Sequence, residues 1–182
     1  GKRALDVGCG AGLASEALAR RGAAVTGLDA AGEALEAARA HAAASGLDIA
    51  YREGLPEDLP PGQTYDAVMA LEVVEHVAER DAFLAALARA VKPGGLVFLS
   101  TLNRTPRAFL MAKLGAEYLL RMLPVGTHDW KMFVTPSELG AGLRGAGLTV
   151  TDIAGMTMDK LTGRWRTSRD VAINYIVMAR KA

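Results

Sequence analysis

The sequence contains a single cysteine, Cys9, among its 182 residues. One cysteine cannot build a disulfide framework, and it cannot supply the several thiolates of a structural zinc site. This scarcity excludes small disulfide-stapled domains and is typical of proteins from reducing compartments. We therefore expect a cytoplasmic protein.

An excess of one charge and long apolar runs are also absent. The chain has 21 basic and 20 acidic residues, a balance that does not favour nucleic acid as a partner. No apolar run approaches the roughly 20 residues that span a bilayer, and no secretion signal is found. Because 51% of the 182 residues are hydrophobic, we expect one well-packed domain over residues 1–182.

Short apolar runs alternate with helical patterns, which predicts parallel βαβ units and an α/β fold with helices on both faces of the sheet. Right-handed crossovers place the ligand crevice of such a fold at the carboxyl ends of the strands. The predicted strands are 4–7, 24–28, 47–51, 65–71, 96–101, 148–153 and 171–179, with a tight turn at 92–95 and the polar stretch 159–168 between the last two strands. The predicted helices are 13–20, 33–44, 81–91, 106–122 and one that starts near Pro136.

A glycine-rich turn follows the first strand and reads Asp6-Val7-Gly8-Cys9-Gly10-Ala11-Gly12. Glycines let the backbone approach a ligand closely, and the N–H groups at a helix start attract anionic groups. The spacing is G-x-G-x-G, whereas dinucleotide-binding folds have G-x-G-x-x-G, so an NAD-dependent oxidoreductase is disfavoured. The alternative is an ordinary strand-to-helix turn.

Asp29 ends the second predicted strand, about twenty residues after the glycine turn. A carboxylate at this place can accept hydrogen bonds from ribose hydroxyls and would repel a 2′-phosphate. The alternative is that Asp29 caps the following helix.

These motifs together resemble the class I S-adenosylmethionine-dependent methyltransferases. The resemblance implies a Rossmann-like fold, with a mostly parallel seven-stranded sheet and a C-terminal antiparallel hairpin. It also implies that the cofactor is held by the glycine turn, by Asp29 at the ribose and by Leu71. The loop at Gly54-Leu55-Pro56-Glu57 departs from the family pattern, which leaves Glu57 as the candidate for adenine. The segments that carry the resemblance are 5–12, 27–29, 65–68, 72–77 and 91–95.

Further segments resemble the ubiquinone-biosynthesis O-methyltransferases, namely 100–104, 115–118, 121–122, 124, 126–129 and 171–175. That resemblance implies methylation of hydroxyls on polyprenylated catechol rings, other quinone-pathway enzymes as partners, and an N-terminal cover segment before this chain. The alternatives are a methyltransferase for another phenolic or lipid acceptor and a non-catalytic cofactor-binding subunit.

Glu72, Glu75 and His76 are spaced i, i+3 and i+4, so on a helix they would share one face. Two carboxylates and an imidazole suit a divalent cation such as Mg²⁺, which could bind catechol oxygens and lower their pKa. The resemblance associates the same three positions with Mg²⁺. The alternative is that the three residues only shape the cofactor pocket.

Residues 106–123 combine an apolar face, including Phe109, Leu110 and Met111, with the cations Arg104, Arg107, Lys113 and Arg121. A basic amphipathic helix can lie in a bilayer interface, so we expect peripheral contact with an anionic membrane surface. The alternative is a lid over the active site.

The candidate catalytic residues are Glu72 and His128, the latter as general base for the ring hydroxyl. We expect His128→Ala to lower turnover and to spare cofactor affinity, because a base acts on the acceptor and not on the cofactor. Steady-state kinetics and calorimetric titration with S-adenosylhomocysteine test this. Loss of folding would instead indicate that His128 braces the 102–134 insertion.

Overall fold

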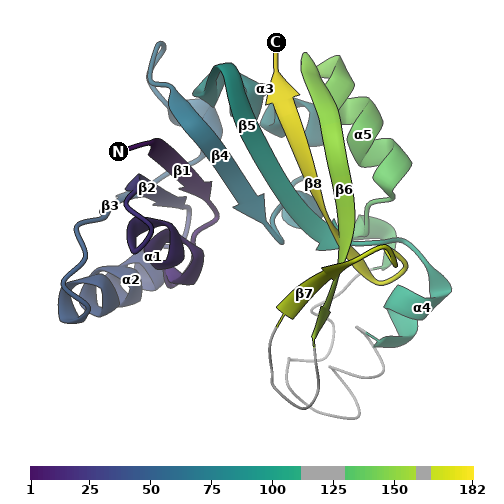
Figure 1. Ribbon diagram of the computed structural model, residues 1–182, viewed down its shortest axis with the longest axis horizontal. Coiled ribbons are helices and arrows are strands. Elements are labelled where there is room, and N and C mark those ends of the chain that lie inside the picture. The colour runs from purple at the N-terminus through teal and green to yellow at the C-terminus, as the bar shows by residue number, and fades with distance from the viewer. Residues whose placement is uncertain (112–129, 159–164) are drawn as a thin grey trace.

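A computed structural model describes residues 1–111, 130–158 and 165–182 of the chain, and these residues form an eight-stranded sheet of order β3-β2-β1-β4-β5-β8-β6-β7 (Figure 1). The neighbouring strands from β3 through β5 pair in parallel, whereas β8 is antiparallel to both β5 and β6. The strands are β1 (Arg3–Val7), β2 (Ala24–Asp29), β3 (Ala50–Glu53), β4 (Tyr65–Leu71), β5 (Val91–Leu102), β6 (Leu148–Met158), β7 (Trp165–Ser168) and β8 (Asn174–Lys181).

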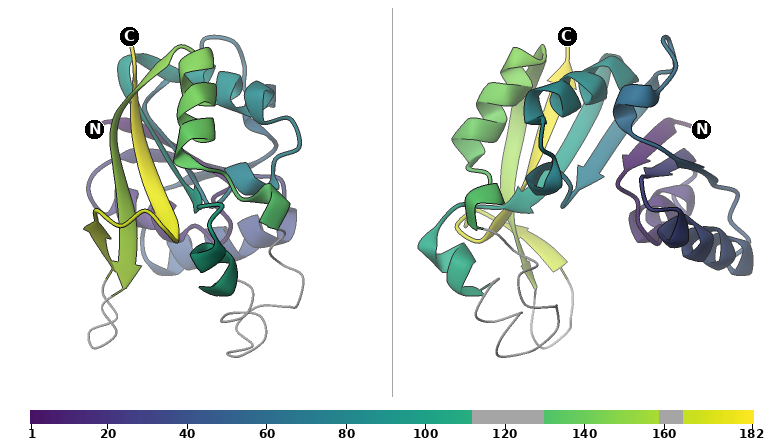
Figure 2. Two further views of the ribbon diagram at one scale, coloured as in Figure 1. Left: turned by 90° about the vertical axis from the view of Figure 1, so that its right-hand side faces the viewer. Right: turned by 180° about the vertical axis from the view of Figure 1, so that it is seen from behind.

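Helices pack on the sheet in two groups. In Figure 1, α3 and α5 lie behind β4, β5, β8 and β6, and α1 and α2 lie beside β1 to β3, while Figure 2 shows the same layers from the side and from behind. The α-helices are α1 (Leu13–Ala19), α2 (Gly32–Ala44), α3 (Arg80–Ala90), α4 (Pro106–Phe109) and α5 (Pro136–Gly145). The 3₁₀ turns are η1 (Pro56–Asp58), η2 (Val74–His76) and η4 (Trp130–Met132). None of the helices in the described ranges is long and apolar enough to cross a membrane.

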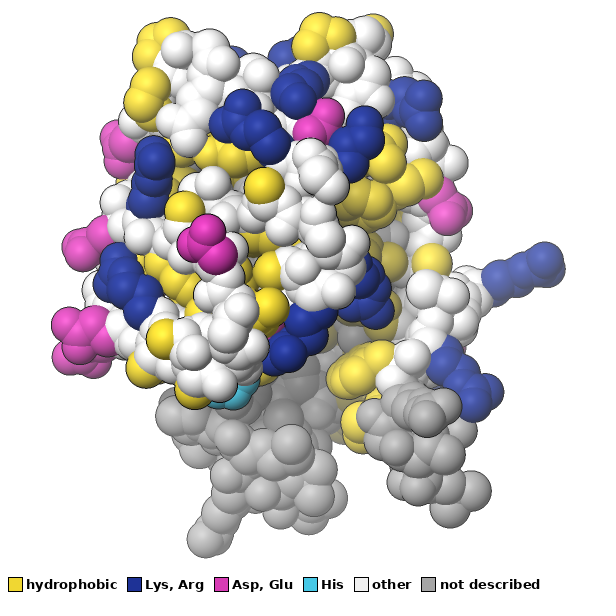
Figure 3. All heavy atoms as spheres, turned by 60° about the vertical axis from the view of Figure 1, so that its left-hand side comes forward, with side chains coloured by type: hydrophobic (Ala, Val, Ile, Leu, Met, Phe, Trp, Pro, Cys, Tyr) yellow, Lys and Arg dark blue, Asp and Glu magenta, His cyan; other side chains and the backbone are white. Residues whose placement is uncertain are grey.

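Two apolar clusters hold these layers together. The larger lies between the sheet and helices α3 and α5, and includes Leu5, Val68 and Leu99, each with none of its surface exposed. The smaller joins α2 to the sheet through Leu35 and Tyr51. On the face shown in Figure 3, basic and acidic side chains are interspersed among apolar ones, as the balanced charge of the sequence predicts.

The predicted α/β fold is confirmed, with one strand more than the seven expected. The additional strand, β7, lies within the polar stretch 159–168 and pairs with the end of β6. The turn expected at 92–95 is included in β5, but the pairing with β4 passes from Tyr65–Val91 to Ala67–Leu96 and omits it, and Gly94 there has φ of 74°.

The third strand begins later than predicted, at Ala50 where Leu47 was expected. The reason is the end of α2. Gly46 has φ of 65° and donates to the carbonyl of Ala43, and Leu47 donates to the carbonyl of Ala42 at 2.9 Å. This pair of bonds is a Schellman cap, which ties Leu47 to the helix end.

The start of the last strand is shifted for a similar reason. Residues 171–173, predicted as strand, instead accept hydrogen bonds from the beginning of the 102–134 insertion. The backbone N–H and side-chain amide of Asn103 donate to the carbonyls of Ile173 and Val171, at 2.8 and 2.9 Å. Of the helix predicted at 106–122, α4 covers Pro106–Phe109, and residues 112–122 lie outside the described residues.

The buried Tyr175 ties β8 to the chain that returns from the insertion, because its hydroxyl donates to the carbonyl of Val134 at 2.9 Å. We expect Tyr175→Phe to lower the free energy of unfolding by about 1–2 kcal/mol, since a buried carbonyl loses its partner. Urea denaturation measures this as a lower midpoint with an unchanged m-value. An unchanged midpoint would mean that another donor satisfies the Val134 carbonyl.

Candidate active site

The glycine turn lies at the carboxyl end of β1 and requires glycine at each of its three positions. Gly8, Gly10 and Gly12 have φ of 68°, 51° and 83°, a region that other L-residues rarely adopt. The backbone N–H groups of Gly8 and Cys9 donate to the carbonyl of Leu28, at 2.7 and 3.1 Å. These bonds fix the turn against the end of β2.

Tyr51 closes the space beneath the turn. A Cβ atom at Gly12 would lie 2.2 Å from the Tyr51 hydroxyl oxygen, and one at Gly27 would lie 2.5 Å from Cδ1 of the same ring. The side chain comes from β3 and has 8% of its surface exposed. Both glycines are therefore required by the position of one tyrosine ring.

Asp29, at the end of β2, fixes the turn from the side. One carboxylate oxygen accepts the N–H of Gly10 at 2.7 Å, and the other accepts the N–H of Ala31 at 2.8 Å. The alternative role as helix cap is wrong, because the N-cap of α2 is Ala31 and no side chain caps it. A carboxylate held in this way at the crevice is suited to accept hydrogen bonds from a sugar.

Asp6 is buried below the turn and supports it indirectly. It is 2% exposed and accepts the Ser15 hydroxyl at 2.6 Å, which links β1 to α1. Burial raises the pKa of this carboxyl to about 6.

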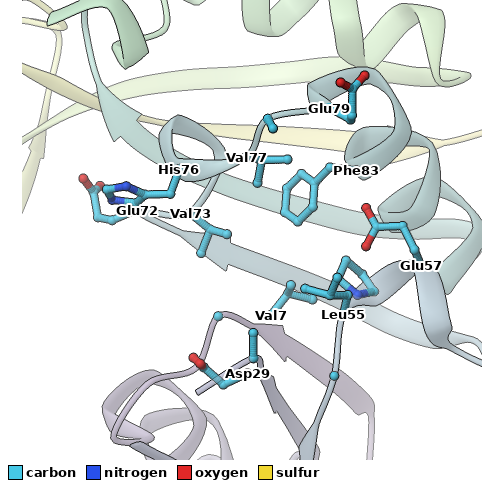
Figure 4. Close-up of a pocket in the computed structure, with 15 residues that line it drawn as sticks. Val7, Asp29, Leu55, Glu57, Glu72, Val73, His76, Val77, Glu79 and Phe83 are labelled. Atoms are coloured by element: carbon cyan, nitrogen blue, oxygen red, sulfur yellow. The ribbon is translucent and has the colours of Figure 1, made fainter. Parts of the chain in front are cut away.

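A cavity of about 570 Å³ opens at the carboxyl ends of the first four strands (Figure 4). Of the predicted cofactor residues, Gly8 and Asp29 line it, whereas Asp6, Gly10, Gly12 and Leu71 are outside the lining. The predicted Glu57, Glu72 and His76 line it as well. The complete lining is Val7, Gly8, Asp29, Ala30, Gly54, Leu55, Pro56, Glu57, Glu72, Val73, His76, Val77, Ala78, Glu79 and Phe83.

Phe83 and Val77 are lining residues that the sequence did not reveal. In Figure 4 both project from the α3 side into the cavity, opposite Val7 and Asp29. An apolar wall with a few polar groups at its margins is typical of small-molecule sites. Phe83 belongs to the buried face of α3, so its pattern in the sequence is that of a core residue.

The proposed arrangement of Glu72, Glu75 and His76 on one helix face is wrong. Glu72 precedes η2 and has φ of 54°, and within the described ranges it is the one non-glycine residue with positive φ. Glu75 is buried, with 4% of its surface exposed, and the burial raises its pKa. Glu72 and His76 instead line the cavity.

These three side chains do not fit a metal ion in this arrangement. In the part of the chain that the structure describes, no group of three His, Cys, Asp or Glu side chains could hold one. One oxygen of Glu75, Oε2, is buried without a hydrogen-bond partner. We therefore derive no catalytic step through Mg²⁺, and the metal site stays a prediction. His128 lies outside the described residues, and its role stays a prediction too.

Comparisons with known proteins identify the family. A family model described as "Methyltransferase domain" matches residues 5–99. A ubiquinone biosynthesis O-methyltransferase of Pseudomonas entomophila is 51% identical over 181 residues, which cover 97% of this chain and 77% of that protein. This chain belongs to the ubiquinone biosynthesis O-methyltransferases. A second member, from Methylobacterium nodulans, is 50% identical over 178 residues, covering 97% of this chain and 72% of its own length.

Solved structures confirm the fold of this methyltransferase. Magnesium protoporphyrin IX methyltransferase from Synechocystis PCC 6803, solved with bound SAH, has a TM-score of 0.73 at 23% identity, over 100% of this chain and 75% of that one. An S-adenosylmethionine-dependent methyltransferase from Methanosarcina mazei has a TM-score of 0.74 at 20% identity, over 99% and 92% of the two chains. The predicted class I architecture is thus confirmed.

Asp29→Ala tests the site. The substitution removes one carboxylate that both accepts the Gly10 N–H and lines the cavity. We therefore expect the Kd for S-adenosylhomocysteine to rise at least about tenfold. Calorimetric titration measures this. The matched control is Asp66→Ala, because Asp66 likewise accepts a backbone N–H, that of Arg3 at 2.8 Å, but at the opposite end of the strands.

The control variant is expected to lose stability and to keep its affinity. Equal weakening of binding in both variants would contradict the assignment of Asp29 to the cofactor site.

Proposed function

We propose that this protein transfers a methyl group from S-adenosylmethionine to a hydroxyl of polyprenylated catechol and demethylubiquinol intermediates of ubiquinone biosynthesis. The observation that carries the proposal is the junction of the glycine turn, Asp29 and an adjoining cavity in a chain of this family. The family supplies the reaction class, and the cavity supplies the place for it.

The residues around the cavity fit the cofactor. Asp29 is the group that would receive the ribose hydroxyls, and the glycine turn beside it would hold the methionine part. Leu55 and Val7 line the same cavity and offer apolar surface to a flat base. Glu57, from η1, stays our candidate for the adenine amine.

S-adenosylmethionine, when bound, supplies an electrophilic methyl group on a sulfonium. The protein must place the acceptor oxygen in line with that group and remove its proton. Glu72 is the residue suited to the second task, because its carboxylate stands at the cavity and can accept the hydroxyl hydrogen. Methyl transfer would break the methyl–sulfur bond and leave S-adenosylhomocysteine, and the Glu72 carboxylate would accept the proton that the acceptor oxygen loses.

The acceptor's tail suggests contact with a membrane, and the apolar surface near α4 supports this. Leu110 and Met111 are 55% and 54% exposed, next to an apolar cavity of about 360 Å³ lined by Pro106, Phe109 and Trp130.

Two of the cations predicted to meet anionic lipids already have partners. Arg104 pairs with Glu138 at 2.6 Å, and Arg107 pairs with Asp170 at 2.7 Å. Among the described residues at and around α4, the proposed peripheral contact therefore depends on apolar area more than on charge.

Calorimetric titration of the protein with S-adenosylhomocysteine, with NAD in a parallel experiment, tests the cofactor assignment. We expect saturable binding of the first and none of the second, because the G-x-G-x-G spacing of the turn departs from the G-x-G-x-x-G spacing of dinucleotide-binding folds. A methyl-transfer assay with a short-chain prenylated catechol then tests the reaction. Binding without turnover would favour the non-catalytic subunit.

The same assay in the presence of a chelator tests the metal prediction. Turnover that is lost with EDTA and restored by Mg²⁺ would show that the reaction requires a metal ion, which would favour the predicted site at Glu72, Glu75 and His76. Unchanged turnover would support proton removal by protein side chains without a metal ion.

A further inference from the structure

Glu72 has a backbone conformation that needs a compensating interaction. Its φ of 54° costs free energy for a residue with a long side chain, and such strain persists where surrounding structure enforces it. The enforcing contact is Ser100, whose carbonyl and hydroxyl oxygens both accept the Glu72 N–H, at 3.0 and 3.1 Å. The backbone N–H of Glu72 is thus held by two oxygens of the same β5 residue.

The side chain of Glu72 is held by the same serine. The Ser100 hydroxyl donates to Oε1 of the Glu72 carboxylate at 2.6 Å. A hydrogen bond from a hydroxyl to a carboxylate at this distance belongs to the stronger class, because its acceptor is charged. One hydroxyl therefore contacts both ends of Glu72, the N–H as acceptor and the carboxylate as donor.

Ser100 is itself rigidly placed. It is 2% exposed, and it pairs with Leu71 on β4 on one side and with Ile176 on β8 on the other. A strand paired on both sides cannot shift its register without moving its neighbours. The sheet therefore fixes the position of the Ser100 hydroxyl. Glu72, by contrast, is exposed, and a glutamate side chain has three rotatable bonds.

We infer that Ser100 is a positioning residue that holds the Glu72 carboxylate at the cavity for removal of the acceptor's proton. This inference depends on the proposed function, which gives the carboxylate its task. A carboxylate has about four acceptor positions, so the bond from Ser100 leaves it able to bind an acceptor hydroxyl. In Figure 4, Glu72 lies with His76 at one end of the cavity, away from Glu57 and Glu79.

A purely structural role would not require the bond from the Ser100 hydroxyl to the Glu72 carboxylate, because the Ser100 carbonyl also accepts the Glu72 N–H. The strand is buried, and a small apolar residue would pack there without the need for a partner. Thr101, the next residue of β5, is also buried, and its hydroxyl lies near Glu75.

The test is a double-mutant cycle of Ser100→Ala and Glu72→Ala, with kcat measured on a short-chain prenylated catechol. We expect Ser100→Ala to lower kcat about tenfold, because the Glu72 carboxylate loses the charge-assisted hydrogen bond from the Ser100 hydroxyl that orients it. In the Glu72→Ala background the same change is expected to have no effect on kcat, since Ser100 acts through that carboxylate.

Three further measurements separate positioning from general damage. The Kd for S-adenosylhomocysteine is expected to stay unchanged in Ser100→Ala, and Ser100→Thr, which keeps a hydroxyl, is expected to recover part of kcat. Thr101→Ala is the matched control, with kcat close to that of the wild type.

The inference would be overturned if the fold-losses of kcat in the two alanine variants multiplied in the double variant, because the residues would then act independently. A Kd that rises in parallel with the fall in kcat would overturn it as well. If Ser100→Ala does not fold, Ser100→Cys keeps the volume and tests the same cycle with a weaker donor. A wild-type protein without turnover would instead refute the proposed function, so the two failures are distinguishable.

Discussion

The hydrogen bond between the N–H of Gly10 and the carboxylate of Asp29 joins the ends of two adjacent parallel strands. The backbone of the glycine turn is fixed by the Gly8 and Cys9 bonds to the carbonyl of Leu28 and by the Gly12 N–H, which donates to the carbonyl of Cys9. The Asp29 carboxylate and the Tyr51 ring below add to these bonds. The cavity wall at Gly8 follows from the shape of this turn. In the proposed cofactor site, the acid assigned to the ribose is therefore also part of the scaffold.

A second constraint acts at the opposite wall of the cavity. Glu72 follows β4 directly, and its positive φ turns the chain away from the strand and into η2. Ser100 on the neighbouring strand stabilises that change of direction through backbone and side chain together. The two walls are thus stabilised in the same way. In each, a side chain of one strand (Asp29 or Ser100) accepts a backbone N–H just beyond the end of the neighbouring strand (Gly10 or Glu72).

Sequence patterns predict the parts of the fold that depend on local periodicity. The bounds of β4, Tyr65–Leu71, agree with those expected, and the glycine turn and Asp29 are where their spacing predicts. The errors arise where a neighbouring element overrides the pattern. Leu47 is apolar like a strand residue, but the cap of α2 holds it; and β7, a short edge strand, forms in a polar stretch because β6 extends to Met158.

The arrangement at Glu72 could not be predicted for a different reason. The i, i+3, i+4 spacing brings side chains to one face only if the backbone is helical throughout. A positive φ at a glutamate has no signal in the sequence, because residues with positive φ are usually glycine. Phe83 was missed because a residue that lines a cavity from a buried helix face has the same pattern as a core residue.

The ring of Tyr51 has a consequence for how this site can change during evolution or by design. It forms a floor shared by Gly12 and Gly27, so neither glycine can gain a side chain while the ring is present. Gly27 needs no unusual backbone angle, so its identity follows from steric contact: a Cβ atom there would lie 2.5 Å from Cδ1 of Tyr51 and 3.0 Å from Sγ of Cys9. Altered ligand preference is thus accessible by substitution at the rim, at Leu55, Glu57 or Glu79, whereas the floor can change only by paired replacements.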